Sequence, residues 1–149
     1  MKAANMVALD TNILVIADDP SSPHHETAKN LLERVLSGSL GACISQQVLG
    51  EYFSVVTSTR RINRPLTGDE AAQRILFLAR SRRLKKVYPR HSTLERSVAL
   101  CARLGIGGAR FFDILYAITL LDNNIHRLMT QNVSDFKMVP GLIPENPFR

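Results

Sequence analysis

The chain has 149 residues, 45% of them hydrophobic and 21% charged, and a net charge of +6. This length and composition predict one globular domain, residues 1–149, and exclude a membrane span, because no apolar run approaches the roughly 20 residues that a bilayer requires. The apolar stretch before Asp10 is too short for a signal peptide, and the two cysteines form no CxxC pair, so we expect a cytoplasmic protein without disulfides or structural zinc.

Short apolar runs alternate with longer segments of helical period, which predicts an α/β fold with a central, mainly parallel sheet. Strands are expected at residues 6–9, 42–44, 86–88 and 126–130, with a short one near Val139 in an otherwise irregular end. Helices are expected at residues 22–38, 45–56, 67–79, 92–104 and 112–121.

Capping residues mark the expected helix starts. Ser22-Pro23 predicts a cap and a first helical residue, and Ser45 predicts a second cap. Thr67–Glu70 and Ser92–Glu95 match the capping box, in which a Ser or Thr and a Glu three residues later each satisfy a backbone N–H.

Basic residues outnumber acidic ones, 19 to 13, and cluster at residues 60–64 and 80–90. The second cluster includes Arg82, Arg83 and Lys85. Because guanidinium groups bind phosphate in a bidentate manner, RNA binding is one interpretation of these clusters. From charge alone, solvated loops and helix ends explain them equally well.

Two acidic residues follow predicted strands. Asp10 ends the first apolar strand, and Asp135 follows the last strong one. Open α/β sheets bind ligands at the carboxyl ends of their strands, so both positions suit a functional site. A helix cap at Asp10 and a turn at Asp135 are the alternative interpretations.

Two further acids lie on apolar helix faces. Helical geometry places Glu51 between Val48 and Val55, and Asp113 on the face of Ala117. A buried carboxylate without a partner is costly, which favours a shared ligand. The helix dipole also favours an acid in a first turn, and this would explain the position of Asp113 but not its inward face.

These four acids together predict one shared site. Clustered carboxylates repel each other unless protons or hard cations lie between them, and oxygen donors suit Mg²⁺ or Mn²⁺. A divalent-metal site on a basic chain indicates phosphodiester chemistry.

Four segments then match a known family in order: VALDTNILV (7–15), SQQVLGEYF (45–53), FDILYAITLL (112–121) and LMTQNVSDF (128–136). Together they resemble the PIN-domain family, and more narrowly the VapC ribonuclease toxins of bacterial and archaeal toxin–antitoxin modules. The resemblance covers nearly the whole chain and implies a PIN-like three-layer α/β/α sandwich.

The resemblance also implies roles for individual residues. The implied metal and catalytic ligands are Asp10, Glu51, Asp113 and Asp135, and the implied supporting polar residues are Asn12, Thr130 and Asn132. The sequence departs from the family in two ways. Asn132 stands where many PIN domains have Asp, which leaves Asp135 as the fourth acid. Tyr116 and Ile118 are bulkier than the small residues often found in that helix.

The implied function is a Mg²⁺- or Mn²⁺-dependent endoribonuclease toxin that cleaves single-stranded or loop RNA. The family further implies a homodimer and a cognate antitoxin, which could bind an apolar surface around Leu31, Leu32 and Leu36. Two alternatives stay open. One is a PIN-type RNA-processing nuclease without an antitoxin, and the other is a non-catalytic RNA-binding module whose acids are structural.

Overall fold

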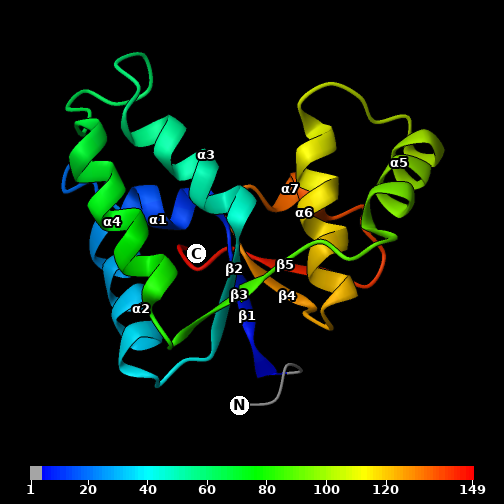
Figure 1. Cartoon of the computed structure of the whole chain (residues 1–149), viewed down its shortest axis with the longest axis horizontal. Helices are drawn as coiled ribbons and strands as arrows, with labels where there is room; N and C mark the ends of the chain where they lie inside the picture. Colours follow the sequence, from blue (N-terminus) through cyan, green and yellow to red (C-terminus); the bar gives the residue numbers. More distant parts are fainter. Residues whose placement is uncertain (1–4) are drawn as a thin grey trace.

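The computed structural model describes residues 5–149. Within that range a five-stranded sheet lies between two layers of helices, with strand order β3-β2-β1-β4-β5 and every neighbouring pair parallel (Figure 1). The strands are β1 (Val7–Leu9), β2 (Ala42–Ser45), β3 (Leu84–Val87), β4 (Arg127–Met129) and β5 (Ile143–Glu145). The predicted α/β class and central parallel sheet are confirmed.

Two groups of helices cover opposite faces of the sheet (Figure 1). One face carries α1 (Thr11–Ala17), α2 (His25–Ser37), α3 (Gln46–Val56) and α4 (Gly68–Arg80). The other carries α5 (Thr93–Leu104), α6 (Arg110–Asp122) and α7 (Val133–Phe136). The three-layer α/β/α sandwich implied by the family resemblance is therefore confirmed.

The central strand β1 determines where the site lies. Its three apolar residues are fully buried, as expected for a strand covered on both faces. Chain order moves outward from β1 through β2 to β3, and then returns to β4 on the other side of β1. The switch in direction therefore falls between β1 and β4, where open α/β sheets form a crevice at the carboxyl ends of the strands.

The local cap predictions have mixed outcomes. The capping box at Thr67 and Glu70 is present, and the Ser45 hydroxyl accepts from the Val48 N–H at the start of α3. The predicted box at Ser92 is wrong, because Ser92 forms no side-chain cap. The neighbouring Thr93 hydroxyl instead accepts from the Arg90 N–H and donates to Asp122 of α6, linking two helices.

Several predicted boundaries shift. Helix α2 begins at His25 and not at Ser22, whose hydroxyl accepts from the His24 N–H in the preceding turn. The last strand is Ile143–Glu145 and not near Val139, which is buried in the core. The sequence predicts α1 only as a segment that Asp10 caps, and it does not predict α7 as a helix.

Both cysteines are buried and unlinked, as predicted. Burial raises the pKa of the Cys43 thiol to about 12, so this group stays a neutral, small apolar side chain. In the part of the chain that the structure describes, none of the helices combines the length and apolar character needed to cross a membrane.

Candidate functional site

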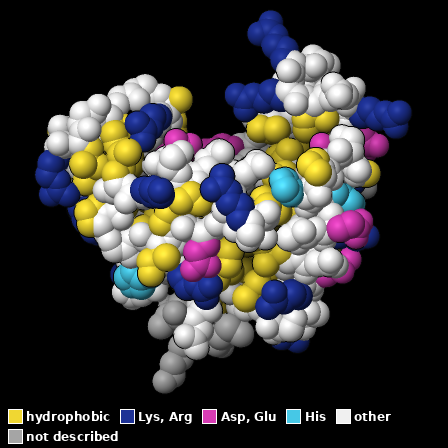
Figure 2. Space-filling view, turned by 180° about the vertical axis from the view of Figure 1, so that it is seen from behind, with side chains coloured by type: hydrophobic (Ala, Val, Ile, Leu, Met, Phe, Trp, Pro, Cys, Tyr) yellow, Lys and Arg dark blue, Asp and Glu magenta, His cyan; other side chains and the backbone are white. Residues whose placement is uncertain are grey.

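A pocket of about 660 Å³ opens at the carboxyl ends of β1 and β4. All four sequence-predicted acids line this acidic pocket, together with two predicted polar residues: Asp10, Glu51, Asp113, Asp135, Asn12 and Asn132. The space-filling view shows acidic side chains on the floor of a notch at the top of the molecule (Figure 2). Residues from α1, α3, α6 and α7 thus meet at one place although they are far apart in sequence.

Asp10 is the most heavily bonded acid of the pocket. It is the N-cap of α1, and its Oδ1 accepts from the Thr11 N–H at 2.7 Å. Its Oδ2 accepts from Asn12 Nδ2 at 3.0 Å and from Thr130 Oγ1 at 2.6 Å. Burial nevertheless raises the pKa of Asp10, and these hydrogen bonds oppose the rise only in part. The capping interpretation of Asp10 is therefore confirmed, and because Asp10 also lines the acidic pocket, its functional role stays a prediction.

The supporting polar residues form a frame between β1 and β4. Thr130 is fully buried, and its hydroxyl accepts from the Asn132 N–H at 3.0 Å while it donates to Asp10. The Asn12 Oδ1 accepts from the Gln131 N–H at 3.1 Å. The three residues thus orient Asp10 and join the first and fourth strands at their carboxyl ends.

Glu51 is held by two residues that the sequence interpretation missed. Thr11 Oγ1 donates to its Oε2 at 2.9 Å, and Gln47 Nε2 donates to its Oε1 at 2.9 Å. The same amide nitrogen donates to the Phe112 carbonyl at 2.9 Å, which ties α3 to α6 beside Asp113. The spacing of four residues between Gln47 and Glu51 is a helical neighbour signal that could have predicted the first contact.

Asp113 carries the clearest electrostatic signature of a shared site. Burial raises its pKa, and the negative charges of Asp10, Asp135 and Glu51 raise it further, to about 6. Arg110 lowers it only slightly. Asp113 is therefore close enough to the other three carboxylates to be affected by their charge, and the first-turn dipole alone does not account for this position.

The donor chemistry of the pocket fits a hard divalent ion. As the side chains stand, no group of three or more Asp, Glu, His or Cys residues within 5–149 is arranged to hold a metal ion. Four carboxylates nevertheless line one opening, and burial together with the negative charges of the other three raises the pKa of Asp113. A divalent cation relieves such repulsion, and Mg²⁺ and Mn²⁺ take oxygen donors of this kind.

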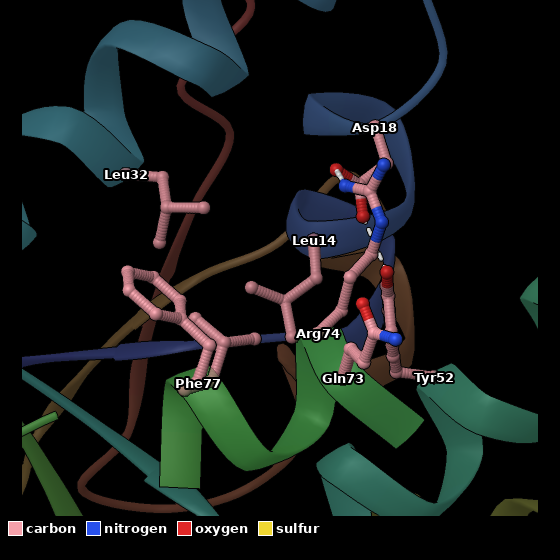
Figure 3. A pocket seen from close by; sticks show the side chains of 8 residues that line it. Leu14, Asp18, Leu32, Tyr52, Gln73, Arg74 and Phe77 are labelled. Atoms are coloured by element: carbon pink, nitrogen blue, oxygen red, sulfur yellow. Dashed lines mark hydrogen bonds and ion pairs between the residues drawn. The ribbon is translucent and has the colours of Figure 1, made fainter. Parts of the chain in front are cut away.

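A separate apolar pocket lies on the helical face formed by α1 to α4. Leu14, Leu32 and Phe77 line it, and 61% of the Phe77 side chain is exposed. At one side of this apolar pocket, the Asp18 carboxylate accepts from the Tyr52 hydroxyl and pairs with the Arg74 guanidinium (Figure 3). These contacts connect the end of α1 with α3 and α4.

The second basic cluster lies away from the acidic pocket. Arg82 and Arg83 directly precede β3, so they lie near the amino ends of the strands, opposite the acids. Gly38 ends α2 at a φ of +83°, and a Cβ there would lie 2.8 Å from Arg83 Nη1, so the Arg83 guanidinium packs on this turn. Lys85 is exposed within β3.

A sequence model of the PIN domain matches residues 7–141. The chain therefore belongs to the PIN-domain family. It is 28% identical to ribonuclease VapC24 of Mycobacterium tuberculosis over 131 residues, which cover 88% of this chain and 89% of that protein.

Solved structures with the same fold come from toxin–antitoxin complexes. VapBC2 of Rickettsia felis, bound to a DNA fragment from its promoter, superposes with a TM-score of 0.66 and 25% identity. The alignment covers 95% of this chain and 98% of that one. A toxin–antitoxin complex from Klebsiella pneumoniae gives a TM-score of 0.62 at 20% identity over 96% and 98% of the two chains, which shows the shared fold.

Proposed function

We propose that this chain is a divalent-metal-dependent endoribonuclease, the toxin of a toxin–antitoxin pair, which cleaves single-stranded or loop RNA. The observation that carries the proposal is the acidic pocket, in which four carboxylates line one opening at the switch point of a chain with a net charge of +6. The similarity to ribonuclease VapC24 supports RNA as the substrate. We further propose that residues 1–149 act as one nuclease domain.

In this proposal the chain's own residues position the reacting phosphate. Asp10, Glu51, Asp113 and Asp135 hold the ion, which when bound activates water and stabilises charge on the phosphate. Asn12 and Thr130 keep the Asp10 carboxylate fixed through the hydrogen bonds described above. Asn132 lies at the exposed rim, where its amide could donate to a phosphate oxygen. A single strand enters such a pocket more easily than a stiff duplex does.

Metal dependence and product chemistry test this proposal. Purified protein should cleave RNA in Mg²⁺ or Mn²⁺ and lose that activity in EDTA. Because water is the nucleophile, the products should carry 5′-phosphate and 3′-hydroxyl ends. Full activity in EDTA, or 2′,3′-cyclic phosphate ends, would indicate attack by the RNA 2′-hydroxyl and contradict the proposal.

An antitoxin is the proposed protein partner, supported by the 25%-identical VapBC2 complex. The proposed binding surface differs from the one expected from sequence, because Leu31 is buried in the core. Leu32 lines the apolar pocket, and Leu36 lines a neighbouring pocket that shares the exposed Phe77. Phe77→Ser should weaken co-purification with the product of an adjacent antitoxin gene, whereas Phe112→Ser, on α6, should not.

A homodimer is the proposed assembly. Leu94 and Val98 are one helical turn apart on α5 and are 58% and 52% exposed, so they offer an apolar strip on the face opposite α1 to α4. Light scattering of the wild type and of a Leu94→Glu, Val98→Glu variant checks this. A monomeric wild type would refute the dimer without affecting the nuclease proposal.

Two competing functions give different results in the same assays. An RNA-processing nuclease would cleave with the same metal dependence but would be harmless on expression and would lack an adjacent antitoxin gene. A non-catalytic RNA-binding module would bind RNA and cleave none in any metal.

A further inference from the structure

A second pocket, of about 670 Å³, adjoins the acidic pocket. Val15 and Arg61 contribute to the walls of both, so the two openings are continuous neighbours. This adjoining pocket lies between the end of α1 and the connection from α3 to α4, which projects beside the notch and carries arginine as its only basic residue type (Figure 2). Its volume lies within the roughly 300–1,000 Å³ typical of pockets that hold small ligands.

The connection that carries Arg61 is held in place. The backbone N–H groups of Arg61 and Ile62 donate to the Ser58 carbonyl at 3.2 and 3.1 Å. The Leu66 N–H donates to the Val56 carbonyl at 2.8 Å and closes the loop at its base. Ile62 and Leu66 also pack against the hydrophobic core. Arg61 therefore stands on a fixed turn between the two pockets.

The adjoining pocket offers separate groups for a phosphate and for a base. Arg61 and Arg64 are exposed, and neither forms an ion pair with any residue that the structure describes, which leaves both free to bind phosphate. On the opposite wall, Asp19 Oδ1 accepts from the Ser21 N–H and hydroxyl at 3.0 and 2.6 Å. Among residues 5–149 its Oδ2 receives no hydrogen bond, so it is available to accept from the amino group of a base.

We propose that the adjoining pocket binds the nucleotide next to the scissile phosphate. Arg61 holds the phosphate at the boundary between the pockets, Asp19 accepts an N–H from the unpaired base, and Val56 and Leu66 form an apolar wall beside it. Guanine, adenine and cytosine each carry an exocyclic amino group that can donate to Asp19 Oδ2, whereas uracil carries none. This proposal rests on the ribonuclease function proposed above.

Neighbouring arginines provide a matched test of the phosphate contact. Arg60 has the same charge and lies on the same turn but lines neither pocket, whereas Arg61 lines both. Anisotropy of a short fluorescein-labelled single-stranded RNA in EDTA measures binding without cleavage. Arg61→Ala should weaken binding about tenfold, the loss of one charge-assisted hydrogen bond, and reduce the salt slope by about 0.7. Arg60→Ala should change affinity by less than about threefold.

The base contact has its own test. Cleavage of a randomised RNA should show a base preference on one side of the cut, and Asp19→Asn should weaken that preference by slowing cleavage beside the preferred base more than cleavage beside the others. Asp69→Asn, an exposed acid of α4 that lines neither pocket, is the control and should leave the preference intact.

The outcomes separate the two proposals. Equal losses for Arg61→Ala and Arg60→Ala would show general attraction by the loop and overturn the nucleotide pocket, even if the wild type cleaves RNA normally. A wild type that cleaves nothing would refute the ribonuclease function, while the anisotropy comparison would still decide whether the pocket binds RNA. If Arg61→Ala leaves RNA binding unchanged but abolishes antitoxin binding, the pocket serves the protein partner and the proposal fails.

Discussion

The two basic segments look alike in sequence, but the first lies near the carboxyl ends of the strands and the second begins at their amino ends. Residues 60–64 stand beside the acidic pocket, where Arg61 lines its wall. Residues 80–83 precede β3 at the amino ends of the strands. The Lys86 ammonium donates to the Leu78 and Ser81 carbonyls at the end of α4 and to the Leu84 carbonyl in β3. Part of the second segment's charge therefore stabilises a helix end. Charge clustering in the sequence does not distinguish these roles, whereas the parallel topology does.

The largest effect on cleavage should come from the acids at the carboxyl ends of the strands. Asp10→Asn, Glu51→Gln and Asp113→Asn should each lower cleavage at least about 100-fold, because each removes one charged group from the pocket. Asp135→Asn, in the short helix α7, should leave residual activity. Glu33→Gln, an exposed acid of α2, is the control. Wild-type rates for Asp10→Asn and Asp113→Asn in metal would show that the site lies elsewhere.

Tyr116→Phe tests whether the carboxyl edge must be held rigidly. The buried Tyr116 hydroxyl donates to the Leu9 carbonyl at 2.7 Å. Leu9 directly precedes Asp10, and Tyr116 lies one helical turn after Asp113 on α6. Leaving the Leu9 carbonyl without this hydrogen bond costs roughly 1–3 kcal/mol, so the cleavage rate should fall about tenfold. The Mn²⁺ concentration needed for half-maximal rate should also rise. Tyr88→Phe, at an exposed position, is the control. A lower melting temperature with unchanged Mn²⁺ dependence would limit Tyr116 to a structural role.

Stability without metal should depend on pH through Asp113. Its pKa is raised from 3.8 to about 6 in the folded chain. The protonated carboxyl therefore stabilises the folded state fully below pH 3.8, and this stabilisation is lost as the pH rises from 3.8 through 6. Asp113→Asn should therefore melt higher than wild type at pH 7 in EDTA. Because the carboxyl is half-buried and screened, we expect about 3 °C, or roughly 1 kcal/mol. Mn²⁺ should stabilise the wild type more than the variant, and equal increments would contradict a ligand role for Asp113.

The smallest effect should come from the amino edge. Replacing Arg82, Arg83 and Lys85 together by Ala should weaken RNA binding less than about threefold and leave the cleavage position unchanged, because phosphate contacts there add affinity without reading sequence. A loss of RNA affinity greater than that of Arg61→Ala would place the RNA at the amino ends of the strands and make the second basic segment the more important one. Melting curves control for the packing of Arg83 on the α2 turn.

The sequence predicts this fold well where patterns are local. The apolar strand before Asp10 and the capping box at Thr67 need only neighbouring residues, and both are confirmed. The predicted box at Ser92 is wrong because the Thr93 hydroxyl bonds to Asp122 of another helix, a contact with no local signal. Tertiary contacts likewise set the position of β5, which pairs with β4 after a buried Val139.

The acidic residues were predictable, but their supports were only partly so. A carboxylate on an apolar face is visible in sequence, and the structure brings all four acids to one pocket. Thr11 and Gln47, which hold Glu51, are ordinary helix residues in sequence, and their contacts depend on how α1, α3 and α6 converge. The function of each acid remains a prediction, which the substitutions above test.

The contact of Asp18 with Tyr52 and Arg74 has a thermodynamic consequence. Tyr52 follows Glu51 along α3, and Arg74 and Phe77 lie on the same helix beside the apolar pocket. A partner that draws Arg74 away from Asp18 would change the environment of Asp18, which accepts the hydrogen bond from Tyr52, the residue next to Glu51. Thermodynamic linkage is reciprocal. If the partner lowers the affinity of the chain for the ion by some factor, the bound ion lowers the affinity for the partner by the same factor. The concentration of free divalent ion would then set how tightly the partner binds the chain.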